Sequence, residues 1–179
     1  PTPLKGAAYG VIDNKIYVAG GTEVAGFTAS NKLEIYDPAT DTWVDTLETM
    51  LYAMYSPTGA VINDKFYVIG GLLGYPPWTG QTTVQMYDPT MDEWFPVAFL
   101  DSGRVGHTTN GIAGKIYAIG GDRQPPLVRS VEEYDPNTGI WTVIDQTPFV
   151  KTSHTASAFK NKIYLISGST TSLLAGFTP

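Results

Sequence analysis

The residues best suited to bind a partner are aromatic and basic side chains in a few short segments. Tyr75 and Trp78 lie in the sequence Tyr-Pro-Pro-Trp, which is too apolar for an ordinary solvated linker. Basic residues lie in or near similar segments. The candidate binding residues are therefore Tyr75, Trp78, Arg104, Arg123, Arg129 and Lys151. The alternative is that the aromatic pair packs on a neighbouring loop and that the basic residues only keep the surface soluble.

Two histidines, His107 and His154, occupy equivalent positions of an internal repeat described below. Two imidazoles on neighbouring repeat units could share a metal ion. Histidines at repeated strand positions are more often hydrogen-bonded within the protein, so we predict no metal site.

Other catalytic chemistry lacks the residues it needs. The chain has no cysteine, which excludes disulfides, thiolate nucleophiles and thiolate metal sites. Ser153 precedes His154, but neighbouring residues of a strand face opposite ways, so their adjacency does not make a catalytic pair. The segment 110–115 partly resembles a phosphate-binding loop, but it lacks a correctly spaced first glycine and the final Ser or Thr. We predict no catalytic residue, no enzyme activity and no cofactor.

An internal repeat of 47 to 51 residues must position the candidate side chains. Each of the first three units has a β-rich run that starts with lysine and ends in paired glycines, followed by Tyr-Asp-Pro and by a tryptophan seven residues after that tyrosine. The paired glycines are Gly20–Gly21, Gly70–Gly71 and Gly120–Gly121, with a degraded copy ending at Gly168. The tyrosines are Tyr36, Tyr87 and Tyr134, and the tryptophans are Trp43, Trp94 and Trp141.

These three features together resemble the kelch motif, over essentially the whole chain. The resemblance implies an all-β fold, a kelch-type β-propeller whose blades are antiparallel four-stranded sheets around a channel. We expect three complete blades, at residues 1–50, 51–100 and 101–147. Residues 148–179 should form a partial fourth blade with two strands. The ring would then be incomplete, so additional blades or another chain should cover its open ends.

The repeated aromatic side chains are expected to pack between blades. They are the strand tyrosines Tyr17, Tyr67, Tyr117 and Tyr164 and the repeat tryptophans Trp43, Trp94 and Trp141. We predict that these three tryptophans are buried and that Trp78 is exposed.

If the strands of a blade are called A to D, the B–C loops and the D–A connections emerge on one face of the propeller. The segment from the second glycine to the tyrosine varies most between repeats, with 15, 16 and 13 residues. Loops that vary on a rigid scaffold commonly carry binding residues. In kelch domains of ubiquitin-ligase adaptors, basic residues at the start of strand A help to bind acidic peptides. Arg104 matches that position and Lys151 approximates it, whereas Leu4 and Met54 replace it in the first two blades.

We therefore expect a non-enzymatic interaction module that binds a protein segment or a glycan on this face. One alternative is a fragment of a carbohydrate-active kelch enzyme that resembles sialic-acid mutarotases. Another is a structural subunit that assembles through open blade edges.

Composition narrows the choice of partners. The formal charge is −6, and only 16% of the residues are charged. This acidic balance argues against a nucleic-acid partner and an anionic membrane surface, and no apolar run is long enough for membrane insertion. Low charge with abundant Thr, Gly and Tyr would suit an extracellular or periplasmic protein.

Overall fold

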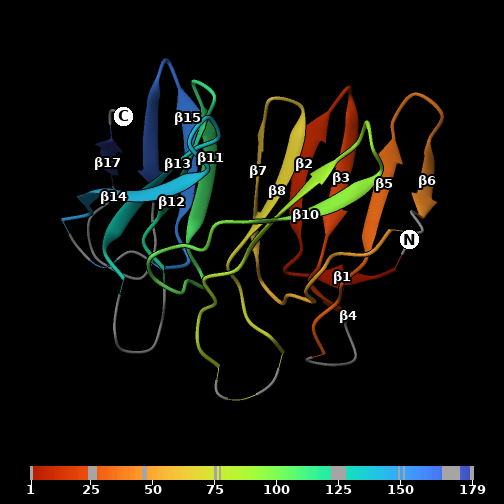
Figure 1. Ribbon diagram of the computed structural model, residues 1–179, viewed down its shortest axis with the longest axis horizontal. Coiled ribbons are helices and arrows are strands. Elements are labelled where there is room, and N and C mark those ends of the chain that lie inside the picture. Colours follow the sequence, from red (N-terminus) through yellow and green to blue (C-terminus); the bar gives the residue numbers. More distant parts are fainter. Residues whose placement is uncertain are drawn as a thin grey trace.

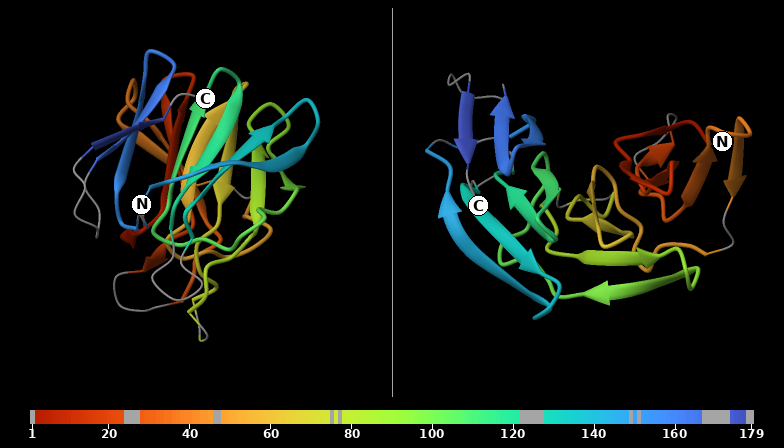
Figure 2. Two further views of the ribbon diagram at one scale, coloured as in Figure 1. Left: turned by 90° about the vertical axis from the view of Figure 1, so that its left-hand side faces the viewer. Right: turned by 90° about the horizontal axis from the view of Figure 1, so that it is seen from above.

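The computed structural model describes residues 2–23, 28–45, 48–74, 76, 78–121, 128–148, 150, 152–166 and 174–177. Among these residues there is no helix, and hence none that is long and apolar enough to cross a membrane. Antiparallel sheets follow one another along the chain (Figure 1). Seen from above, they fan along an open arc whose two ends do not meet (Figure 2, right). The predicted all-β fold is confirmed.

Each sheet of three or four strands is one blade, with its strands in chain order. Blade one contains β2 (Ala8–Ile12), β3 (Lys15–Ala19), β5 (Leu33–Asp37) and β6 (Thr42–Asp45). Blade two contains β7 (Thr58–Ile62), β8 (Lys65–Ile69), β9 (Val84–Asp88) and β10 (Glu93–Val97). Blade three contains β11 (Thr108–Ile112), β12 (Lys115–Ile119), β13 (Ser130–Asp135) and β14 (Ile140–Gln146). Blade four contains β15 (Thr155–Phe159), β16 (Lys162–Ile166) and β17 (Leu174–Phe177). A separate two-stranded ribbon pairs β1 (Leu4–Lys5) with β4 (Thr22–Glu23).

Local sequence explains where the strands end. The second strand of each complete blade stops immediately before its paired glycines, and the third stops at the aspartate of Tyr-Asp-Pro. Proline cannot donate a hydrogen bond to the next strand, so the ladder is interrupted there. Asp13 and Asn14, between β2 and β3, both have positive φ angles, of 50° and 60°. Such a two-residue turn matches the twist of a β-hairpin.

The lysine that opens each second strand pairs with the aspartate that ends the third strand of the same blade. The pairs are Lys15–Asp37, Lys65–Asp88 and Lys115–Asp135. Hydrogen bonds from Lys65 and Thr90 lower the pKa of Asp88 to about 2. The pairs thus hold the same two strand ends together in three blades.

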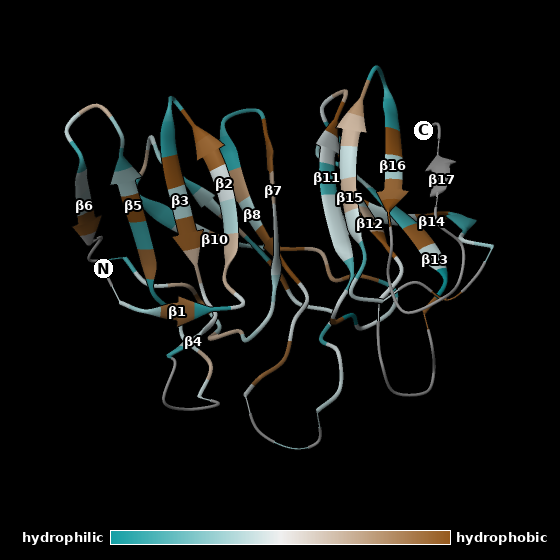
Figure 3. Cartoon of the chain, turned by 180° about the vertical axis from the view of Figure 1, so that it is seen from behind, coloured by the Kyte–Doolittle hydropathy of each residue, from teal (hydrophilic) through white to brown (hydrophobic). Residues whose placement is uncertain are grey.

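The hydrophobic core lies between blades. The seam between blades one and two buries Tyr17, whose ring lies 6.2 Å from Phe66 and 6.0 Å from Tyr87 of the next blade. Tyr87 in turn contacts Trp94, at 5.3 Å between ring centroids. Equivalent clusters fill the seams between blades two and three and between blades three and four. Brown apolar bands cross β3 and β16 in Figure 3.

Burial of the repeat tryptophans follows from this geometry, with one correction. Trp94 and Trp141 are buried and Trp78 is exposed, as predicted. Trp43 was predicted to be buried, but 39% of its surface is exposed. The tryptophan of a blade packs toward the preceding blade, and no described residue precedes blade one in the arc. Trp43 keeps the contact with the tyrosine of its own blade that all three tryptophans make, at 5.1 Å from the ring of Tyr36, but its other side is open to solvent.

Blade four also differs from the prediction, because it has a third strand. β17 pairs with β16 so that Ile163 lies opposite Phe177. This register matches Ile116 opposite Tyr134 in blade three. Phe177-Thr178-Pro179 is therefore a degraded copy of Tyr-Asp-Pro that sequence inspection missed.

Candidate functional site

The lower edge of the blades in Figure 1 carries the long connections and is called the loop face here. It contains loop one (residues 20–32), loop two (70–83) and loop three (120–129), which join the second and third strands of blades one to three. The connections that enter blades two, three and four lie on the same face. Backbone bridges join the two kinds of segment, as between Ser30 and Met54 and between Gln81 and Arg104. Both kinds of segment therefore share one face, as predicted.

One residue in the segment that enters the next blade bonds both ends of each of the first two loops. For loop one, Gly21 N donates to Met54 O at 2.8 Å and Met54 N donates to Ser30 O at 3.0 Å. For loop two, Gly71 N donates to Arg104 O at 2.8 Å and Arg104 N donates to Gln81 O at 3.1 Å. The loops thus project from fixed bases.

The paired glycines make these close contacts possible. Gly70 has a φ of +61°, and a β-carbon there would lie 2.7 Å from His107 Cε1 and 2.8 Å from Arg104 O. A side chain at this position would therefore clash with the next blade. Any residue other than glycine would also be strained by the positive φ. The first glycine of the pair therefore makes room for the next blade at the bases of loops one and two.

Loop two presents the aromatic part of the candidate site. Trp78 is 41% exposed, and Pro76 beside it is exposed. Tyr75 lies outside the described residues. Trp78 lies between Gly71 and Gln81, which are both hydrogen-bonded to the backbone of Arg104. A large apolar side chain is therefore held at the surface of the loop face.

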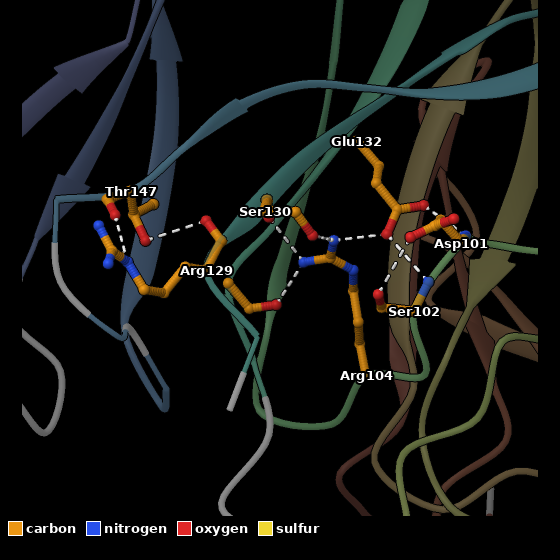
Figure 4. Close-up of polar contacts among 8 residues, drawn as sticks. Asp101, Ser102, Arg104, Arg129, Ser130, Glu132 and Thr147 are labelled. Carbon is orange, nitrogen blue, oxygen red and sulfur yellow. Dashed lines mark hydrogen bonds and ion pairs between the residues drawn. The ribbon is translucent and has the colours of Figure 1, made fainter. Parts of the chain in front are cut away.

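Arg104 was predicted to reach a ligand, but its side chain is wholly buried. Its Nη2 lies 2.6 Å from Glu132 Oε1, which is buried as well (Figure 4). Burial lowers the pKa of the Arg104 guanidinium, and the Glu132 carboxylate opposes that shift. The expectation of ligand contact is corrected: a guanidinium that is buried and paired with a buried carboxylate cannot reach a ligand at the surface.

The other basic candidates are placed only in part. Arg129 is exposed, but its Nε donates to Thr147 O at 2.9 Å and its Nη2 to Pro148 O at 3.0 Å. It therefore links loop three to the connection that enters blade four while its charge stays at the surface (Figure 4). Arg123 and Lys151 lie outside the described residues.

Sequence reasoning missed a buried polar residue two positions before each repeat tyrosine. Glu34, Gln85 and Glu132 are all buried. Each accepts a backbone N–H from the segment that enters its own blade: Glu34 from Thr2, Gln85 from Tyr52, and Glu132 from Asp101 and Ser102. The sequence does contain a signal for these residues, because Glu or Gln occurs at the same position of all three repeats.

The inner strands line a second concave region, a groove of about 540 Å³. Both histidines lie in its wall and bind the preceding blade, with His107 Nε2 2.7 Å from Thr58 Oγ1 and His154 Nε2 3.0 Å from Thr108 Oγ1. Burial, with the nearby charges of Arg104 and His154, lowers the pKa of His107 to about 3. His107 is thus a neutral, structural imidazole near pH 7.

Four-stranded antiparallel blades along an arc, with cores between blades and loops gathered at one edge, define this protein as a β-propeller fold. The Kelch motif family matches residues 3–45, 53–98 and 103–146. The chain belongs to the kelch-repeat family.

Two human relatives show the extent of the similarity. Kelch repeat and BTB domain-containing protein 12 is 31% identical over 140 residues, which cover 68% of this chain and 22% of that protein. Kelch-like protein 23 is 30% identical over 116 residues, which cover 64% of this chain and 20% of that protein. The chain spans about a fifth of the length of these relatives.

A solved structure, described as the structure of YjhT, has a TM-score of 0.78 at 20% sequence identity. The match covers 93% of this chain and 59% of that one. This similarity supports the propeller fold.

Proposed function

We propose that this chain is a non-enzymatic interaction module that binds an extended protein segment on its loop face. The observation that carries the proposal is the exposed Trp78 on a loop with a fixed base. Exposed aromatic side chains of this kind dominate the free energy of many protein interfaces, and a rigid base lowers the entropy lost on binding. The names of two relatives place kelch repeats beside another domain, a BTB domain in one and an F-box in the other, which agrees with a recruiting role.

The groove along the inner strands supports the non-enzymatic part of the proposal. Among its described lining residues, the ionisable side chains are His107, His154 and Tyr9. Both histidines already hydrogen-bond to threonines of the preceding blade. General acid–base catalysis requires groups positioned at the substrate with suitable pKa values, and a buried imidazole with a pKa of about 3 is a poor candidate.

Selection from a displayed library of random 12-residue peptides, with a glycan array in parallel, tests the proposal. We expect peptides that bind the wild-type chain and bind Trp78→Ala at least about tenfold more weakly, the loss typical of a hot-spot residue. Trp43→Ala is the matched control, because Trp43 has nearly the same exposure, 39% against 41%, but lies on the outer strand of blade one. Glycans bound in place of peptides would contradict the partner class. Equal effects of both substitutions would contradict the site.

A further inference from the structure

Arg104 has two sets of contacts, and each set holds a different loop. Its backbone groups bond both ends of loop two, with Arg104 O accepting from Gly71 and Arg104 N donating to Gln81. The main chain of Arg104 thus adds to the direct bonds that already join the ends of loop two, from Gly70 N to Thr83 O and from Gln81 N to Gly71 O.

The side chain of Arg104 closes loop three. Its Nη1 donates to Gly120 O at 2.6 Å, at the first residue of the loop, and to Ser130 O at 2.9 Å, immediately after the loop. Its Nη2 donates to Ser130 Oγ and to Glu132 Oε1, both at 2.6 Å (Figure 4). Charge-assisted hydrogen bonds of this kind are among the stronger polar contacts in proteins. Loop three is therefore clamped at both ends by the same guanidinium.

Blade two provides an internal comparison, because Met54 occupies the position of Arg104. Met54 makes the same backbone bonds to the ends of loop one, and it is also buried. Its thioether side chain has no N–H to donate, so it cannot clamp the ends of loop two. The residue at the position of Glu132 changes as well: Gln85 in blade two is neutral, whereas Glu132 in blade three is acidic. The charged pair of blade three thus replaces a neutral Met–Gln pair of blade two.

We infer that Arg104 is a positioning residue that couples loops two and three, so that a change in the base of one loop is transmitted to the other. The ends of loop one are bonded to Met54 and not to Arg104, so the amides of loop one report changes that do not pass directly through Arg104. For partner binding the inference rests on the proposed function, because it assumes that the loop face binds. The part of the inference that concerns the geometry of the loops rests only on the contacts of Arg104.

The double variant Arg104→Met with Glu132→Gln gives blade three the two residue types, Met and Gln, that blade two has at these positions. Arg104→Met alone leaves the Glu132 carboxylate buried without its guanidinium, and the protein should melt at a lower temperature. The double variant removes that unpaired charge and should recover most of the lost melting temperature. It therefore separates loss of the clamp from loss of folding.

Amide hydrogen exchange on the double variant tests the coupling, with the amides of residues 28–31 in loop one as internal reference. We expect exchange of the amides near Gly121 and Ser130 to rise by roughly tenfold, as expected from the loss of charge-assisted hydrogen bonds. Exchange at Gly71 and Gln81 should rise by a smaller factor, and the reference should not change. A rise confined to loop three would overturn the coupling, and unchanged exchange in both loops would overturn the positioning role.

A binding measurement then relates the coupling to function. A peptide selected on the wild-type chain, if it needs Trp78, should bind the double variant several-fold more weakly, although Arg104 cannot touch it. Unchanged affinity would show that the coupling does not reach the partner. Failure to select any peptide would count against the proposed function, while hydrogen exchange would still decide the coupling.

Discussion

Gly103 and Gly80 lie so close together that a β-carbon on Gly103 would sit 2.0 Å from the Gly80 carbonyl oxygen. A β-carbon on Gly80 would meet the backbone nitrogen of Arg104 at 2.6 Å. The segment that enters blade three thus packs directly against the backbone of loop two, and only residues without a side chain fit at this contact. Loop two is fixed both by hydrogen bonds and by this close backbone contact.

Gly103→Ala should therefore destabilise the protein and displace loop two. We expect a loss of roughly 1–3 kcal/mol in the free energy of unfolding, as for other overpacked sites, measured by urea denaturation. Gly114→Ala is the control for the added methyl group, because a β-carbon there has nothing within 4 Å and its cost is confined to the positive φ of Gly114. A Gly103→Ala loss no larger than the control would show that the backbone contact yields easily.

The two tryptophans Trp94 and Trp43 should differ in their contribution to stability. Trp94 is 8% exposed within the seam between blades one and two, so Trp94→Ala should cost roughly 3–5 kcal/mol. Trp43→Ala should cost much less, because that side chain is already in contact with solvent. Urea denaturation of both variants compares the same substitution at equivalent repeat positions. Equal losses would show that burial between blades does not determine the contribution of the repeat tryptophan.

The pH dependence of stability should include a contribution from His107. Thr58 donates its hydroxyl hydrogen to Ile69 O at 3.4 Å, so the Thr58 oxygen accepts from His107 Nε2. Protonation would then place a hydrogen on Nδ1, which is buried without a hydrogen-bond partner among the described residues. Arg104 and His154 are the charged or titratable groups that face this imidazole and oppose its charge.

The folded pKa of His107, about 3, lies below the value of about 6.5 for an unfolded chain. Between these two values the unfolded chain binds a proton that the folded chain does not, so stability falls as the pH is lowered from 6.5 toward 3. The slope from this residue should approach about 1.4 kcal/mol per pH unit. Urea denaturation of wild type and His107→Gln at pH 4 to 8 measures it. An unchanged slope in the variant would contradict the assignment.

The repeat spacing predicts the strands well because their ends depend on local chemistry, such as the proline after Asp37 and the glycines after Ala19. Burial of a particular side chain depends instead on which blade lies next to it, and a repeat pattern does not contain that information. Trp43 was wrongly predicted for this reason. Arg104 was also wrongly predicted, because its burial depends on a partner, Glu132, that lies 28 residues later in the sequence.

The two end faces of the arc should drive self-association of this 179-residue chain. Ile16 and Val18 of blade one are only half-buried, whereas Phe66 and Val68 at the equivalent positions of blade two are buried by the preceding blade. At roughly 25 cal/mol for each Å² of apolar surface removed from water, covering such a face is favourable. Tyr9 on blade one and Phe159 on blade four are 72% and 60% exposed.

Light scattering should therefore show a mass that rises with protein concentration, and the double substitution Tyr9→Lys with Phe159→Lys should lower that mass toward the monomer. Each lysine would place a charge on an apolar face and oppose its burial against another protein surface. Met91→Lys is the matched control, because Met91 is 58% exposed in a turn of blade two, away from both end faces. A wild-type chain that stays monomeric up to millimolar concentration, with a cooperative melt, would show that the exposed end faces do not cause association.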